Sequence, residues 1–441
     1  MKRPSAPTLH QLRLRESHLF VVLSIVVGVL AGLSAVLFTV TIGRVGRVLF
    51  GVDPGALRLV AVPTLVSILT GFLLARVFPD VRGSGIPQTE SAYHLQDGYM
   101  RPTAPLGKFI TGVLCIASGH SMGREGPSVQ IGAGIASAVA QWLRLPPARV
   151  RDLVPIGAAG ALAAAFNTPV SAVLFALEEI VGDMNAPLLG SAVIASVASV
   201  VVERAILGND PLFRVPTYQL LHPAELGAYA VLGVVGGAIS LVFCKALLAL
   251  RAGFRRLPQW TVVWQPAMGG LAIGLLILVA PQVMGVGYEY VDQALNGGLV
   301  LRTMIALCLL KLLATVLSYS SGNAGGIFGP TLYMGAMLGG AAGMIAHRFA
   351  PFPVGDPGAY ALVGMGALFA GIIRAPMTSV FMIFELTQDY QILVPLMVAN
   401  LLSFTISRRY QPVTIYHALL EQDGTPLPPR TPHSSAVVGT G

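Results

Sequence analysis

Two acidic residues and one serine are the residues of this sequence whose types and surroundings could do chemistry. Glu125 lies in Gly-Arg-Glu-Gly-Pro (123–127), and Glu179 follows an apolar run that ends at Leu177. Ser84 lies in Gly-Ser-Gly-Ile-Pro (83–87). Carboxylates inside apolar segments commonly carry protons, and a serine hydroxyl donates hydrogen bonds. Proton handling and anion contact are therefore the chemistry to consider.

Three short glycine–proline motifs share one physical design. Glycine lets the backbone turn tightly, and proline at a first helical turn has a preset φ and no N–H to leave unpaired. Each motif predicts a helix that begins in mid-membrane, and its free N–H groups and positive dipole end suit a dehydrated anion. The motif residues are Gly83, Ser84, Gly85, Ile86 and Pro87; Gly123, Arg124, Glu125, Gly126 and Pro127; and Gly326, Ile327, Phe328, Gly329 and Pro330.

Glu125 stands at the start of one of these predicted helices. A carboxylate there would occupy the place that an anion prefers, and protonation would remove that attraction. The alternative is a glutamate that only caps its helix, which short motifs of this kind often contain. Because ionisable residues inside membranes are usually functional, the sequence favours a functional role.

Glu178 and Glu179 are adjacent and so point about 100° apart on a helix. Glu178 has a counterpart in an internal repeat, Glu385, which favours a structural, hydrogen-bonded role for both. Glu179 has Leu386 as its counterpart and is the better candidate for proton handling.

Other polar residues in apolar surroundings give weaker signals. Lys108 is interpreted as a side chain that reaches the interface, whereas Lys311 lies deeper in its segment and adds positive potential. His94 and His120 have no metal-ligand spacing and receive no role, so no metal site is predicted. Tyr416 would, on composition alone, be an interfacial aromatic residue.

The composition is that of an integral membrane protein. Of 441 residues, 54% are hydrophobic and 11% are charged, whereas soluble domains carry about 25% charged residues. The 50 glycines suit close helix packing. The net charge of +8 is distributed over the ends of apolar segments, which argues against nucleic-acid binding. The same distribution predicts a protein of the inner membrane whose amino terminus lies in the cytoplasm.

The elements that must position these residues are apolar helices, several of them long enough to span a bilayer. We expect a cytoplasmic segment at 1–17, a first membrane repeat at 18–206, a second repeat with a final helix at 207–420, and a disordered tail at 421–441. Shorter segments broken by Gly or Pro, such as 128–142 and 169–182, suit helices that are buried or line a cavity.

The two halves are related by an internal repeat. Residues 106–133 align without a gap with residues 309–336, which superposes Gly123 on Gly326 and Pro127 on Pro330. Residues 157–178 align with 364–385 at a slightly larger offset. Repeated membrane units bind their substrates where the copies meet, although this repeat alone leaves parallel and inverted arrangements open.

Taken together and in this order, the three motifs and Tyr416 resemble the CLC family of chloride channels and chloride/proton antiporters over residues 18–420. The resemblance implies an all-α polytopic fold of two inverted repeats, a homodimer, and an anion pathway in each subunit. It also implies that chloride is bound by the hydroxyls of Ser84 and Tyr416 and the backbone N–H groups of Ile327 and Phe328. Glu125 matches the family's extracellular gate, Glu179 its intracellular proton-transfer glutamate, and Lys108 a buried lysine position.

The resemblance favours exchange of chloride for protons, with chloride as bound substrate and no cofactor. Channel members typically carry an apolar residue where Glu179 stands, and nitrate-preferring members have Pro where Ser84 stands. Fluoride-exporting members depart from motifs that are intact here. A passive, voltage- or pH-gated chloride channel is the alternative. A serine hydrolase using Ser84 with His94 or His120 is a remote one, because no nucleophile–base spacing is recognisable.

Overall fold

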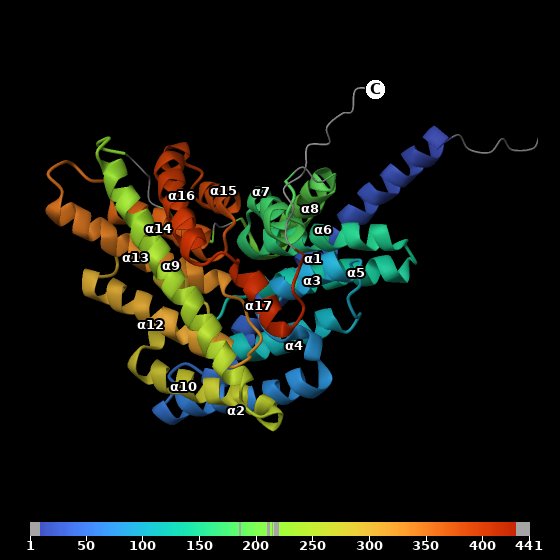
Figure 1. Ribbon diagram of the computed structural model, residues 1–441, viewed down its shortest axis with the longest axis horizontal. Coiled ribbons are helices and arrows are strands. Elements are labelled where there is room, and N and C mark those ends of the chain that lie inside the picture. Colours follow the sequence, from blue (N-terminus) through green and yellow to red (C-terminus); the bar gives the residue numbers. More distant parts are fainter. Residues whose placement is uncertain (1–8, 185–186, 210–211, 214, 216–219, 429–441) are drawn as a thin grey trace, which may run out of the picture.

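The computed structural model describes residues 9–184, 187–209, 212–213, 215 and 220–428, with side chains from residue 18 onward. These residues are helical apart from their loops, and their only strand-like pairing is an isolated antiparallel bridge between Gly123 and Gly326 (Figure 1). The expected all-α architecture is confirmed.

The helices fall into two runs that match one another. The first run comprises α1 (Leu9–Phe50), α2 (Ala56–Phe72), α3 (Ile86–Leu95), α4 (Ala104–Ala117), α5 (Glu125–Trp142), α6 (Pro147–Phe166), α7 (Pro169–Phe175), which continues as the π-helical turn η3 (Ala176–Val181), and α8 (Leu189–Leu207). The second comprises α9 (Glu225–Arg255), α10 (Gln265–Val279), α11 (Tyr288–Leu295), α12 (Leu301–Ser320), α13 (Phe328–Phe349), α14 (Pro357–Ile372), α15 (Pro376–Thr387) and α16 (Leu393–Tyr410). A last helix, α17 (Ile415–Asp423), follows both.

Equivalent helices make equivalent contacts in the two halves. Helix α5 packs on α6 as α13 packs on α14, and α1 packs on α8 as α9 packs on α16, while α2 and α10 pack on each other (Figure 1). Glycine allows this closeness, because a Cβ added at Gly132 would collide with the carbonyl oxygen of Gly157. Gly335 and Gly364 make the same contact in the second half.

Two glutamates join the halves reciprocally. Glu178, in η3, accepts hydrogen bonds at its carboxylate from the N–H groups of Met377 (3.2 Å) and Thr378 (2.8 Å) at the start of α15. Glu385, in α15, accepts from the N–H groups of Val170 (2.8 Å) and Ser171 (2.7 Å) at the start of α7. Each half thus caps a helix of the other, which is the structural role predicted for this pair.

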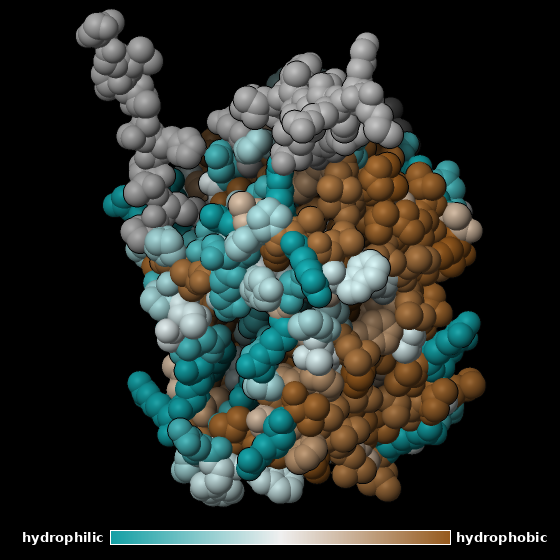
Figure 2. All heavy atoms as spheres, turned by 90° about the vertical axis from the view of Figure 1, so that its right-hand side faces the viewer, coloured by the Kyte–Doolittle hydropathy of each residue, from teal (hydrophilic) through white to brown (hydrophobic). Residues whose placement is uncertain are grey.

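Six helical segments of the described chain are long and apolar enough to cross a membrane: His18–Phe50, Ala56–Val77, Leu189–Leu207, Glu225–Arg255, Leu301–Ser320 and Tyr390–Asp423. Their outward faces carry large apolar side chains such as Leu37, Val197 and Leu401. Figure 2 shows such atoms as a broad brown area on one side of the molecule, with polar side chains gathered beside it. This surface suits contact with lipid.

The ends of the chain differ in detail from the expected division. Helix α1 begins at Leu9, so the segment expected at 1–17 is helical from that residue and continuous with the first span. Helix α17 ends at Asp423, beyond position 421 where the tail was expected to begin. Residues 1–8 and 429–441 lie outside the described part of the chain.

Candidate functional site

The candidate site is built where two helix starts face each other at the centre of the repeat. Gly123 and Gly326 exchange backbone hydrogen bonds of 2.7 and 2.8 Å, so the loops that precede α5 and α13 run antiparallel. Equivalent loops paired in this way bring the amino termini of both helices to one place. Unpaired N–H groups and positive dipole ends therefore converge there.

The Glu125 side chain occupies the start of α13. Its carboxylate accepts a hydrogen bond at Oε2 from the backbone N–H of Gly329 (3.1 Å), and at Oε1 from the hydroxyl of Tyr288. The residue is fully buried. Glu125 is the first residue of α5, yet its carboxylate is bound to the amino terminus of the other repeat's helix, where an anion would be favoured.

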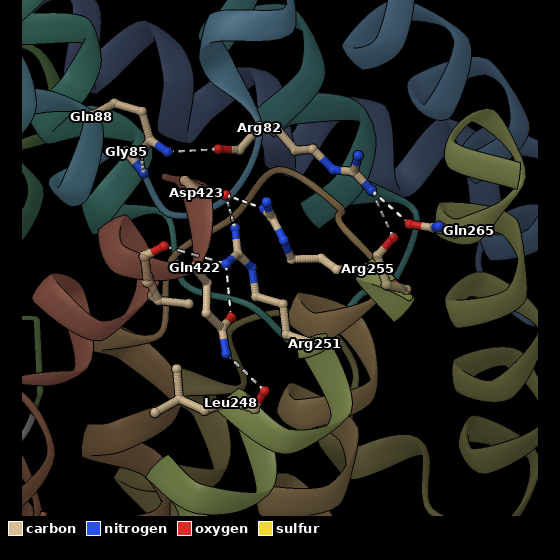
Figure 3. Close-up of polar contacts among 11 residues, drawn as sticks. Arg82, Gly85, Gln88, Leu248, Arg251, Arg255, Gln265, Gln422 and Asp423 are labelled. Atoms are coloured by element: carbon tan, nitrogen blue, oxygen red, sulfur yellow. Dashed lines mark hydrogen bonds and ion pairs between the residues drawn. The ribbon is translucent and has the colours of Figure 1, made fainter. Parts of the chain in front are cut away.

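Ser84 is held in a tight loop before α3. Gly83 (φ +88°) and Gly85 (φ +107°) adopt conformations that side chains rarely allow. The Gln88 amide closes the loop, because Oε1 accepts from the N–H of Gly85 and Nε2 donates to the carbonyl of Arg82, both at 2.9 Å (Figure 3). The hydroxyl of Ser84 is thereby fixed close to Gly126, beside the start of α5.

Both buried lysines support loops. Lys108 Nζ donates to the carbonyls of Val81 (3.0 Å) and Gly83 (2.5 Å), and Lys311 Nζ donates to those of Val283 (3.0 Å) and Gly285 (2.7 Å). The interpretation of Lys108 as a residue that reaches the interface is wrong, because its side chain is fully buried. Two backbone carbonyl oxygens accept hydrogen bonds from its ammonium group, so the side chain does not need to extend to water.

Four hydrogen-bond donors near this centre have no described acceptor. The hydroxyls of Ser84 and Tyr416 are both buried and lie close to each other, and none of the described hydrogen bonds joins either of them to another residue. None of the described hydrogen bonds uses the N–H of Ile327 or Phe328, at the start of α13. Buried donors are normally satisfied, so this cluster favours an acceptor from outside the chain.

The Phe328 ring is packed among other rings. Its centroid lies 5.0 Å from that of Phe166 and 4.5 Å from that of Phe369. These apolar neighbours exclude water from the start of α13, which strengthens electrostatic attraction there.

Glu179 lies on a different element from Glu125. It is in the π-helical turn η3, which points it inward, and 1% of its surface is exposed. The Tyr416 hydroxyl and the Arg374 guanidinium are among the charged or polar groups near its carboxylate. Glu178, one residue earlier, points to α15 instead, so the adjacent pair faces two environments as predicted.

A cavity of about 670 Å³ adjoins the loop that holds Ser84. Arg82, Gln88 and Arg251 are among its lining residues. Arg251 and Arg255 both pair with Asp423 of α17 (2.7 and 2.6 Å), whereas Arg82 takes part in no described ion pair and donates to Gln265 Oε1 at 3.2 Å (Figure 3). The charged residues of the cavity wall are Asp80, Arg82, Arg101, Arg251 and Asp423, so its guanidinium groups outnumber its carboxylates by three to two.

The two histidines do not form a hydrolytic site. His120 Nε2 lies 2.7 Å from the hydroxyl of Ser67, and His94 Nε2 lies 2.9 Å from the carbonyl of Ile180. Ser84 has neither of them as a hydrogen-bond partner. The hydrolase alternative is therefore wrong, because the nucleophile has no base.

Comparison with known proteins identifies the family. Residues 66–408 match the family model described as voltage gated chloride channel. The chain belongs to the CLC family. Its architecture is that of CLC transporters, whose fold contains inverted repeats, which confirms the inverted arrangement that the resemblance implied and that the repeat alone left open.

Relatives within the CLC family include transporters from several bacteria. The chain is 32% identical to the H(+)/Cl(-) exchange transporter ClcA of Vibrio cholerae, over 93% of this chain and 92% of the relative. A ClcA of Salmonella paratyphi A is 33% identical over 85% of this chain and 82% of its own. Both are transporters, which agrees with the expectation that this chain is no enzyme.

Solved CLC structures match over most of the chain. A slow cyanobacterial Cl-/H+ antiporter superposes with a TM-score of 0.83 at 27% identity, covering 92% of this chain and 97% of that one. A CLC-type fluoride/proton antiporter superposes with a TM-score of 0.77 at 25% identity, covering 94% and 99%. The chain is thus a multi-pass membrane protein of the transporter type.

Proposed function

We propose that the protein exchanges chloride for protons across the membrane. The observation that carries the proposal is the Glu125 carboxylate, which accepts the N–H of Gly329 at the start of α13. A protonatable group that sits where an anion is favoured makes anion passage depend on protonation. The bacterial relatives named as H(+)/Cl(-) exchange transporters support this assignment.

Chloride is proposed to bind beside Glu125 through the four donors without described acceptors. These are the hydroxyls of Ser84 and Tyr416 and the backbone N–H groups of Ile327 and Phe328. A transported ion must also be released. Neutral hydrogen-bond donors suit this requirement, because they bind an anion more weakly than a fully charged group would.

Glu125 is proposed to act as the gate. In its deprotonated form the carboxylate accepts the hydrogen bond of the Gly329 N–H and repels chloride from the same helix start. Protonation removes the charge, so the side chain leaves and chloride takes its place. In each such cycle, Glu125 carries one proton in the direction opposite to that of the anions.

Glu179 is proposed to supply protons from the other mouth of the pathway. It is buried near Tyr416, whose hydroxyl lies close to that of Ser84. We assign that mouth to the cytoplasm, together with the amino terminus, and the protein to the inner membrane as a homodimer with a pathway in each subunit. Crosslinking in membranes tests the dimer, and labelling of a terminal tag tests the orientation.

Liposomes containing purified protein test the function. An outward chloride gradient should drive proton uptake against a proton gradient, recorded simultaneously with chloride release by electrodes. Chloride flux with no proton movement would establish the channel alternative, and absence of both fluxes from folded protein would exclude anion transport.

A further inference from the structure

The loop that presents Ser84 has a second copy on the other side of the site. Pro79-Asp-Val-Arg-Gly-Ser-Gly-Ile86 precedes α3, and Pro281-Gln-Val-Met-Gly-Val-Gly-Tyr288 precedes α11. Both begin with one 3₁₀ turn, at Pro79–Val81 and Pro281–Val283, and continue through two glycines with positive φ. Tyr288 thus occupies the position of Ile86 in the first copy.

The second loop is held by the same device as the first. Lys311 donates to the carbonyls of Val283 and Gly285, as Lys108 does to those of Val81 and Gly83. A buried ammonium that bonds two carbonyls fixes the backbone of a loop. The direction in which Tyr288 leaves that loop is therefore set by the fold.

The Tyr288 side chain reaches Glu125 and packs against two other side chains. Its hydroxyl donates to Glu125 Oε1. The Phe213 ring packs edge-on against it, with centroids 5.2 Å apart, and the Arg124 guanidinium lies 5.6 Å from its centroid. Tyr288 therefore holds one carboxylate oxygen while the N–H of Gly329 holds the other.

We propose that Tyr288 is a positioning residue that latches the Glu125 carboxylate in the closed pathway. The inference rests on the proposed gating role of Glu125. A hydroxyl that donates to a carboxylate stabilises the charged form, and protonation weakens the contact. Tyr288 thus sets both the pH at which the pathway opens and the rate at which Glu125 leaves.

Tyr288→Phe removes the hydroxyl and keeps the ring. Loss of one charge-assisted hydrogen bond should raise chloride efflux at pH 7.5 by about tenfold. Because the carboxylate of Glu125 loses one of its two described donors, the pH at which efflux is half-maximal should shift upward. Tyr288→Leu, which also lacks the hydroxyl, should act in the same direction.

Two controls separate a latch from a general change in shape. Tyr290→Phe, two residues further along α11, should leave rate and pH profile unchanged, since no described hydrogen bond joins it to Glu125. In a Glu125→Ala background, Tyr288→Phe should have no effect, because the carboxylate that it holds is gone.

Two outcomes would overturn the latch. One is a Tyr288→Phe protein with the wild-type rate and pH profile, and the other is equal acceleration with and without Glu125. The proposed exchange is judged separately by proton flux in the wild type. If wild type moves chloride without protons while Tyr288→Phe still shifts the pH profile, the latch stands and the exchange assignment falls.

Discussion

Replacing Glu125 is the most direct test of the site, since its carboxylate holds the N–H that an anion would use. A chloride ion at that helix start would lie about 4 Å from the carboxylate, and two like charges at that distance repel by about 4 kcal/mol at an effective dielectric constant of about 20. This energy corresponds to a reduction in occupancy of about three orders of magnitude. Deprotonated Glu125 is therefore sufficient to keep chloride out.

Glu125→Gln imitates the protonated acid, and Glu125→Ala removes the side chain that blocks the site. Both variants should retain chloride flux, lose proton coupling and lose most of the pH dependence of wild type, in which flux falls as pH rises. Chloride and proton electrodes on liposomes, from pH 4.5 to 8, measure all three. Glu289→Gln, a change at an exposed acid in α11, is the matched control and should behave as wild type.

The gate assignment would be refuted by either of two results. Glu125→Ala could abolish chloride flux although the purified protein remains monodisperse and helical, which would make Glu125 part of the path itself. Alternatively, the same variant could keep full proton coupling, which would place proton transfer on another residue.

Three further predictions concern residues of other elements. Glu179→Gln should lose proton coupling and keep a chloride flux that still responds to external pH; intact coupling in the liposome assay would exclude it from the proton route. Ser84→Pro should raise nitrate transport relative to chloride in a competition assay, since a hydroxyl aimed at a spherical ion is lost; an unchanged preference would remove Ser84 from the site. Glu178→Ala and Glu385→Ala should each lower the free energy of unfolding by about 2 kcal/mol, the upper range for a lost helix cap; unchanged melting in detergent for either would contradict the reciprocal capping.

The fold was predictable to a large extent because its signals are local. Long apolar segments, the glycine–proline motifs and the repeat each follow from residue types at fixed spacing. The structural, hydrogen-bonded role of Glu178 and Glu385 was predictable too, because each is the repeat counterpart of the other, whereas the crossing of their contacts between the halves was not predicted. The repeat alone did not give the relative orientation of the copies, since equivalent sequences arise equally from parallel and inverted units; the inverted arrangement was predicted only through the resemblance to the CLC family.

The site contains two features that simple sequence rules missed. Lys108 lies near the start of its helix, where a lysine usually reaches water, and only the tertiary fold brings two carbonyls to its ammonium. Tyr288 was missed although a signal existed, because the glycines at 285 and 287 repeat those at 83 and 85. That copy lacks the serine and proline that made the first loop conspicuous, and its tyrosine acts on a residue far away in the chain.

The crossed glutamates bear on how such a protein could arise. The amino terminus of α7 is capped by α15, and that of α15 by the turn that continues α7, so each half supplies the acceptor for these N–H groups of the other half. A half-length polypeptide with one such glutamate would leave these N–H groups without acceptors unless it met a second, oppositely oriented copy of itself. Two copies solve the problem for both at once. The duplication of one gene, followed by fusion, would have preserved the crossed helix caps that an antiparallel pair of identical chains had already formed.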